Sequence, residues 1–149
     1  MPHWEEPGAT YFLRFGLQRP AVVDLTVPEI GRLVVGALKH WDGDRYVLYD
    51  YTVMPDHVHA ILRPIVDAHS AEQLSRILGP LKGWLARQIN ALVGRQGPLW
   101  QAETYDHIIR DDADYLARAG YIFDNPHTEG LIADPLDWPW WGRGSGATE

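Results

Sequence analysis

The order of strand-like and helix-like segments is the feature of this sequence that most constrains its fold. Four short segments are rich in aromatic and β-branched residues, which is typical of strands, and they cover 10–18, 45–54, 57–63 and 106–109. One segment with helical spacing separates the first two strands, and a second separates the last two. Because only Pro55-Asp56 connects the two middle strands, they should form a hairpin.

Capping residues predict where the helices begin. Thr26 with Glu29 three residues later is a capping box, and the first helix should run from there to about Trp41. A second capping box begins at Ser70, and leucine and isoleucine residues then continue at helical spacing as far as Leu92. Gly79-Pro80 should kink this second helix or divide it into two.

A third helix completes the pattern. Acidic residues at 111, 112 and 114 are suited to its first turn, and Asn125-Pro126 should end it at about Asp124. The resulting order is the βαββαβ order of a ferredoxin-like domain with one helix added. We therefore expect an α+β fold with an antiparallel sheet, helices on one face and the other face open to a ligand. Two prolines within 134–141 predict irregular structure there.

Composition is that of an ordinary globular protein. The 149 residues, 46% of them hydrophobic and 22% charged, fit a single domain over 1–149, with a loose arm at 1–8 and a flexible tail at 142–149. The absence of cysteine excludes a disulfide framework, an Fe–S cluster and a thiolate zinc site. No apolar run approaches the roughly 20 residues of a membrane-spanning helix, so a cytoplasmic protein without a membrane partner is expected.

A pair of histidines lies in the third predicted strand. His57 and His59 are two residues apart, so both imidazoles leave the same face of the sheet. Two imidazoles on one face can bind a single divalent metal ion. The same spacing also fits two histidines that only pack or form hydrogen bonds on a half-exposed sheet.

A second pair lies near the end of the third predicted helix. Tyr121 and Asn125 are four residues apart and therefore share a helix face. Tyrosine can act as a nucleophile through its hydroxyl group, and asparagine can offer an oxygen to a hard metal ion. Alternatively, Tyr121 packs in the core and Asn125 is simply the residue that ends a helix before proline.

Three blocks of sequence, taken together, resemble the REP-associated tyrosine transposases, which are single-tyrosine HUH endonucleases. The blocks are YTVMPDHVHAIL at 51–62, LWQAETYDHIIR at 99–110 and YIFDNPHTEGL at 121–131. They occur in the order and at the spacing of the family, and the ending DWPW at 137–140 is similar as well. The resemblance covers residues 11 to 141.

The resemblance implies a role for each of the two pairs. His57 and His59 match the family's two metal ligands, Asn125 matches the position of the third ligand, and Tyr121 matches the nucleophile. The metal ion would be Mg²⁺ or Mn²⁺. Family members cut single-stranded DNA beside hairpins of palindromic repeats, so the implied partner is a single strand that carries such a hairpin.

The implied reaction is metal-dependent cleavage and rejoining of DNA through a 5′-phosphotyrosine intermediate. The hydroxyl of tyrosine has an ordinary pKa of about 10, so the site needs a group that takes its proton. Asp56, Asp106 and His107 are the candidates for a base or for residues that orient the ligands. Tyr105 and Tyr115 compete for the role of nucleophile, but neither has an Asn or Gln one helical turn later.

Cations and aromatic rings are the expected DNA contacts, because they neutralise phosphates and stack on unpaired bases. The candidates are Arg14, Arg63, Lys82, Arg87, Trp100, Arg110, Trp138 and Trp140. Trp100 also fits a place in the core. The net charge of −7 departs from the basic character common in the family and should weaken DNA binding at physiological salt.

Two other functions fit the same residues. One is a binding module of the same fold that holds structured DNA or RNA without cutting it. The other is a metal-dependent hydrolase of small phosphoesters, which would not need Tyr121. The sequence is compatible with a monomer and with a homodimer.

Overall fold

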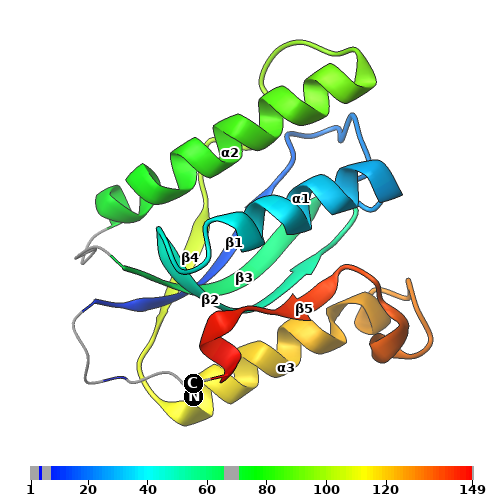
Figure 1. The fold of residues 1–149 in the computed structure, drawn as a ribbon. Coiled ribbons are helices and arrows are strands. Elements are labelled where there is room, and N and C mark those ends of the chain that lie inside the picture. The colour runs from blue at the N-terminus through cyan, green and yellow to red at the C-terminus, as the bar shows by residue number, and fades with distance from the viewer. Residues whose placement is uncertain (1–3, 5–7, 66–70, 149) are drawn as a thin grey trace.

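The computed structural model describes residue 4 and residues 8–65 and 71–148 (Figure 1). The main elements are β1 (Thr10–Gly16), α1 (Pro28–His40), β2 (Tyr46–Val53), β3 (His57–Pro64), α2 (Ala71–Val93), β4 (Tyr105–Ile109), α3 (Asp112–Thr128) and β5 (Trp141–Arg143). Short 3₁₀ helices cover Pro135–Asp137 and Ser145–Thr148. The predicted order of strands and helices is confirmed, with β5 as an addition.

The strands form one antiparallel sheet in the order β4-β1-β3-β2-β5. The first four of these positions have the strand order of a ferredoxin-like sheet, and β2 and β3 form the predicted hairpin. In the centre of the sheet, His59 lies opposite Arg14 of β1 and Thr52 of β2. The two histidines of β3 therefore lie on a central strand, which pairs with a neighbouring strand on each side.

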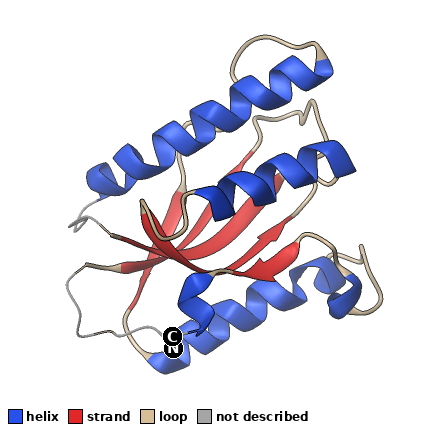
Figure 2. Cartoon of the chain, in the orientation of Figure 1, coloured by secondary structure: helices blue, strands red, loops and turns tan. Residues whose placement is uncertain are grey.

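Helices cover both faces of the sheet, which corrects the prediction that one face is open. The helices α1 and α2 lie over one face, and α3 lies over the other (Figures 1 and 2). The second face carries its own apolar side chains, including Phe12 and Ile61, which pack against Tyr115 and Ile122 of α3. Burying them stabilises α3 in this position.

The chain after α3 is ordered, so the predicted flexible tail at 142–149 is wrong for the described residues 142–148. Strand β5 pairs with the edge of β2, and Gly142 lies against Tyr51, where a Cβ atom would come within 2.3 Å of the tyrosine oxygen. Asp42 then accepts a hydrogen bond from the hydroxyl of Ser145, at 2.6 Å. The segment 134–141, predicted to be irregular, contains a 3₁₀ turn and the first residue of β5.

The N-terminal arm falls largely outside the described residues. Residues 1–3 and 5–7 are not described, but Trp4 is. The indole N–H of Trp4 donates a hydrogen bond to a carboxylate oxygen of Asp112, at 2.6 Å, and its ring lies against that of Tyr115. Residue 4 is thus held at the first turn of α3.

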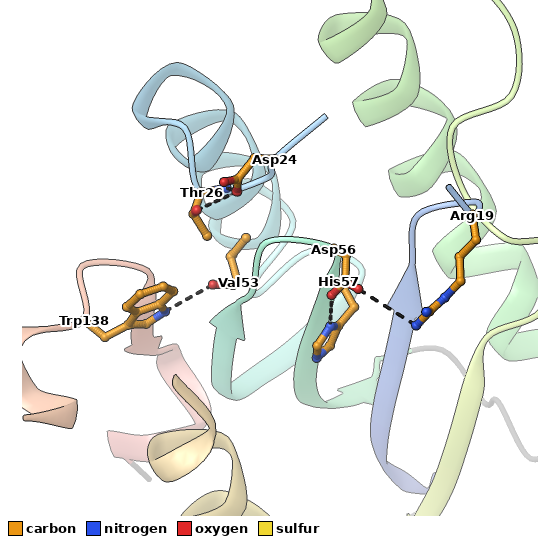
Figure 3. A network of polar contacts seen from close by, with 7 residues as sticks. All are labelled: Arg19, Asp24, Thr26, Val53, Asp56, His57 and Trp138. Atoms are coloured by element: carbon orange, nitrogen blue, oxygen red, sulfur yellow. Dashed lines mark hydrogen bonds and ion pairs between the residues drawn. The ribbon is translucent and has the colours of Figure 1, made fainter. Parts of the chain in front are cut away.

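The helix ends differ from the predicted ones. The N-cap of α1 is Val27, and no side chain among the described residues accepts a hydrogen bond from the free N–H groups of its first turn. The hydroxyl of Thr26 instead donates to Asp24 (Figure 3). The helix α2 continues through Gly79-Pro80 without division, and both residues lie on its exposed side, where water can satisfy the carbonyl that proline leaves without a donor. The predicted cap at Ser70 lies outside the described residues.

The end of α3 also lies beyond its predicted position. The helix continues through Pro126 to Thr128, and the backbone N–H of Glu129 donates to the carbonyl of Asn125. Asn125 is therefore a helical residue and does not end the helix. No helix within the described ranges has the length and apolar character required to cross a membrane.

Candidate active site

The two histidines of β3 share the sheet face that α3 covers. The centroids of the His57 and His59 rings are 4.8 Å apart, and the rings are nearly perpendicular. His59 is buried, with 3% of its surface exposed, and its ring stacks on Phe12 at 5.2 Å between centroids. Strand alternation thus brings the imidazoles together, as predicted.

Asp56 orients the first of these rings. Its Oδ1 atom lies 2.7 Å from Nδ1 of His57, and its other oxygen lies 3.9 Å from the guanidinium of Arg19 (Figure 3). Burial alone would raise the pKa of Asp56, but the hydrogen bond with His57 and the nearby arginines outweigh it and keep that pKa below its ordinary value. With Nδ1 engaged, Nε2 of His57 is the nitrogen available to a ligand.

Burial determines the protonation of both imidazoles. It lowers the pKa of His57, although the contacts with Asp56 and the Asn125 side chain offset part of the effect. For His59, burial and the charge of His57 lower the pKa to about 3. The rings are therefore neutral at physiological pH, and neutral imidazole is the form that binds a metal ion.

Three buried atoms at this place lack a hydrogen-bond partner among the described residues: Nδ1 and Nε2 of His59 and Oδ1 of Asn125. Buried polar atoms are rarely left without a partner, so this group needs an explanation. Imidazole nitrogen and amide oxygen are both donors to divalent metal ions. In the described part of the chain, no cluster of three His, Cys, Asp or Glu side chains could hold a metal ion, so the third protein donor here would be the amide of Asn125.

The side chain of Tyr121 lies against His59. Its ring is 5.3 Å from that of His59 and 6.1 Å from that of Phe12, between centroids. Tyr121 is 49% exposed, whereas Asn125, one turn later, is buried. The helix thus brings an accessible hydroxyl-bearing ring and a buried amide to the same histidine pair.

The competing tyrosines differ from Tyr121 in their surroundings. Tyr115 is buried, and its hydroxyl donates to the carboxylate of Asp50. Burial and this hydrogen bond raise the pKa of Tyr115 far above its ordinary value, which makes it unsuitable as a nucleophile. Tyr105 is exposed on the same sheet face as the histidines and contacts the edge of Phe12.

The three candidates for a base or an orienting residue separate in the structure. Asp56 contacts His57, as described. His107 lies on the histidine face but bonds to Asp114 of α3, at 2.8 Å. Asp106 faces the other side of the sheet, beside a cavity that Lys82 also lines, so its predicted role at the site is wrong. Adjacent residues of a strand point to opposite faces, which separates Asp106 from His107.

The candidate DNA-binding cations also divide between the two faces. Arg14 lies beside the site, opposite His59 in register, and its charge lowers the pKa of Asp56, although it forms no hydrogen bond or ion pair within the described residues. Arg63 shares this face of β3 by alternation, and Arg110 is exposed after β4. Lys82 and Arg87 lie on α2, across the sheet from Tyr121, so their predicted contact with a strand bound at Tyr121 is not supported.

The tryptophan candidates are engaged in packing. Trp100 is buried, contacts Phe15 edge to face and donates to the carbonyl of Lys82, so its alternative place in the core is confirmed and its role in DNA contact is not. Trp138 donates to the carbonyl of Val53 (Figure 3). Trp140 packs against Gly31 of α1. Both are half-buried, which limits them as stacking platforms.

Arg118 lies on the same sheet face as the histidines and is not among the residues predicted from the sequence. Its guanidinium lies 5.1 Å from the centroid of Phe12, the ring that also contacts His59 and Tyr121. A signal was present, because Arg118 is three residues before Tyr121 and so shares its side of the helix. This spacing places Arg118 near the histidines only because α3 lies on their face of the sheet, which local spacing does not determine.

Two curated proteins match the chain in sequence. A putative REP-associated tyrosine transposase of Haemophilus influenzae is 28% identical over 94 residues, and the REP-associated tyrosine transposase of Escherichia coli K12 is 28% identical over 90 residues. The chain is thus similar in sequence to REP-associated tyrosine transposases. The matches cover 59% and 60% of the chain but 53% and 49% of these relatives, so the chain spans about half their length. No protein-family model matches the chain.

Solved structures of transposases share the fold. The structure of a REP-associated tyrosine transposase bound to a REP hairpin superposes with a TM-score of 0.67 at 23% identity and covers 95% of this chain and 80% of that one. A putative transposase from Deinococcus radiodurans R1 gives a TM-score of 0.54 at 17% identity over 88% of this chain and 96% of that one. The α+β fold expected from the sequence is thereby confirmed.

Proposed function

We propose that the chain is a metal-dependent endonuclease and strand transferase that acts on single-stranded DNA near hairpins, in the manner of a transposase. One observation carries the proposal: the accessible ring of Tyr121 lies against the buried ring of His59, which contacts His57, and the unpartnered oxygen of Asn125 lies one helical turn after Tyr121. A nucleophile next to neutral metal-binding donors is the arrangement that phosphodiester cleavage requires.

The metal ion would be held by His57, His59 and Asn125. Mg²⁺ or Mn²⁺ suits an amide oxygen and tolerates imidazole. When bound, the metal ion would withdraw charge from the scissile phosphate and favour attack on phosphorus. Asp56 would keep the His57 ring in the orientation that presents Nε2, as carboxylates do for metal-bound histidines.

The residues of the chain would perform the transfer. The hydroxyl oxygen of Tyr121 would attack phosphorus and form an ester with the 5′ phosphate, while the phenolic proton passes to a base. The bond from phosphorus to the 3′ oxygen would break, and this oxygen would leave as a 3′-OH after taking a proton. Attack by a 3′-OH on the phosphotyrosine would reverse the step, so rejoining needs no nucleotide cofactor.

Arg14 supports the assignment of a nucleic-acid substrate. Its guanidinium lies close enough to Asp56 to lower the pKa of that carboxyl, but it forms no ion pair or hydrogen bond among the described residues, so its N–H donors remain available to a phosphate. The REP-associated tyrosine transposase of similar fold is bound to a REP hairpin in its solved structure. We extend hairpin recognition to this chain as part of the proposal.

The decisive experiment is covalent trapping. Labelled single-stranded DNA carrying hairpins would be incubated with the protein and Mn²⁺, in parallel with Tyr121→Phe and with an excess of chelator. We expect a denaturant-stable protein–DNA adduct that requires both Mn²⁺ and Tyr121. Tyr51→Phe is the matched control, because it removes a hydroxyl from the other side of the sheet.

Other outcomes identify the other candidate functions. Equal DNA binding by the wild type and Tyr121→Phe, with no adduct in either, would indicate a module that only binds. Hydrolysis of a small phosphodiester that survives Tyr121→Phe would indicate a metal-dependent phosphoesterase. Either result would refute the proposed mechanism.

A further inference from the structure

One side of α3 carries a continuous row of polar residues along the histidine face. Asp114, Arg118, Tyr121 and Asn125 are spaced by four, three and four residues, so they follow one another along the same side of the helix. Tyr121 and Asn125 belong to the proposed active site. Asp114 and Arg118 extend the row toward the start of α3, where the proposed reaction assigns them no part.

Arg118 is held by one end of its guanidinium and free at the other. Its Nε lies 3.3 Å from Oδ1 of Asp114, and its Cζ lies 5.1 Å from the centroid of Phe12. Its two terminal amino groups make no hydrogen bond within the described residues, and 33% of the side chain is exposed. Such a guanidinium is oriented in advance and keeps four N–H donors for an anion.

The carboxylate that orients Arg118 is itself fixed. His107 of β4 bonds to the other oxygen of Asp114, at 2.8 Å. Hydrogen bonds from His107 and Arg118 outweigh burial and keep the pKa of Asp114 below its ordinary value, so the carboxylate stays charged. The chain of contacts from His107 to Asp114 to Arg118 therefore connects the sheet edge to the helix and defines where the guanidinium lies.

An exposed aromatic ring accompanies this guanidinium. Tyr105 is 54% exposed and contacts the edge of Phe12, with centroids 6.3 Å apart. Phe12 is thus shared: it contacts Tyr121 and His59 of the proposed active site, and also Tyr105 and Arg118. Arg118 and Tyr105 thus contact the same ring, and a cation and an exposed aromatic ring on one surface are the elements with which proteins bind an unpaired nucleotide.

We propose that Arg118 and Tyr105 form a second nucleotide subsite next to the His57–Tyr121 centre. The terminal amino groups of Arg118 bind the phosphate adjacent to the scissile one, and Tyr105 stacks on the base of that nucleotide. The subsite rests on the proposed function, since it assumes that a single strand lies across this face. It implies that the bound single strand runs along α3, from Tyr121 toward the start of the helix.

The test measures binding and does not depend on cleavage. A fluorescent oligothymidylate would be titrated with protein in chelator, at several salt concentrations, and followed by anisotropy. Arg118→Gln should weaken binding about tenfold at low salt and reduce the slope of log K against log salt by about 0.7, the value for one phosphate contact on a single strand. Arg32→Gln, an exposed arginine on α1, is the control for charge alone and should leave the slope unchanged.

The second arm separates stacking from the hydroxyl of the tyrosine. Tyr105→Leu should weaken binding about tenfold without changing the salt slope, and Tyr105→Phe should bind like the wild type, because a phenyl ring still stacks. Arg118→Lys should retain the salt slope, and it guards against loss of folding in the glutamine variant. Unchanged affinity in Arg118→Gln or in Tyr105→Leu would refute the role of that residue, and no binding by the wild type would refute the subsite as a whole.

The outcome is distinguishable from that of the covalent-trapping experiment. If the wild type forms no adduct but Arg118→Gln shows the expected reduction in the slope of log K against log salt, the subsite is supported and the proposed chemistry is refuted. If the adduct forms normally in Arg118→Gln and binding is unaltered, the chemistry stands and the subsite fails.

Discussion

The contact between Tyr115 and Asp50 provides a quantitative test of how α3 is held on the sheet. The carboxylate of Asp50, on β2, has 1% of its surface exposed. Among the described residues its side chain has two donors, the hydroxyl of Tyr115 and Nε of Arg143, which lies 3.1 Å away. Tyr115→Phe removes one donor and leaves the ring in place. The carboxylate then remains buried with an unsatisfied lone pair.

The expected cost follows from the burial. A buried acceptor that loses its donor costs about 1–3 kcal/mol, and the larger values apply when the acceptor is charged. We expect Tyr115→Phe to lower the free energy of unfolding by about 2 kcal/mol, which for a chain of this size is about 6 °C in Tm. Arg143→Gln should cost about 1 kcal/mol, because the arginine side chain is 60% exposed and water screens its charge.

Urea denaturation followed by circular dichroism measures both values. Tyr51→Phe is the control, since Tyr51 is buried on the other side of the sheet and makes no hydrogen bond within the described residues. A loss below about 0.5 kcal/mol in Tyr115→Phe, the size of an ordinary surface substitution, would refute the reasoning. Such a result would mean that packing alone holds α3 in position.

Three further predictions concern pH, packing and metal. Burial raises the pKa of Tyr46 and Tyr115 above the ordinary value of about 10, so these hydroxyls lose their protons at lower pH in the unfolded chain than in the folded one. The free energy of unfolding should therefore keep this contribution below about pH 10 and fall as the pH rises further. A urea midpoint that does not change with pH in this range would contradict the prediction. Gly31→Ala should cost about 1–3 kcal/mol in urea denaturation, because its Cβ would come within 2.8 Å of the Trp140 ring, and an unchanged midpoint would show that Trp140 moves freely. Mn²⁺ should raise the Tm of the wild type more than that of Asn125→Ala, and equal shifts would exclude the amide as a ligand.

Local rules were sufficient for much of the fold. Alternation along a strand places His57 and His59 on one face whatever surrounds them, and helical spacing brings Asn125 to the same side as Tyr121. The same rule of alternation separates Asp106 from His107, so the error at Asp106 was avoidable from the sequence alone.

Other features had no local signal. The segment 141–143 is short, contains glycine and lacks a strand pattern, and it becomes a strand only because the edge of β2 offers backbone partners at residues 50–52. Pro126 stays within α3 although proline cannot donate to the carbonyl four residues earlier, and its burial offsets the lost hydrogen bond. The hydroxyl of Thr26 donates to Asp24 and does not cap α1.

The sequence by itself therefore places the members of each pair on one face, of a strand for His57 and His59 and of a helix for Tyr121 and Asn125. It does not show that the two pairs come into contact. This contact requires α3 to lie on the sheet face that α1 and α2 do not cover, where Phe12 and Ile61 offer an apolar surface for the helix to pack against. The same packing brings Arg118 and Tyr105 next to Phe12. Local spacing is dictated by backbone geometry, whereas the contact between the two pairs is dictated by burial of apolar surface between segments far apart in the chain, which only the tertiary structure reveals.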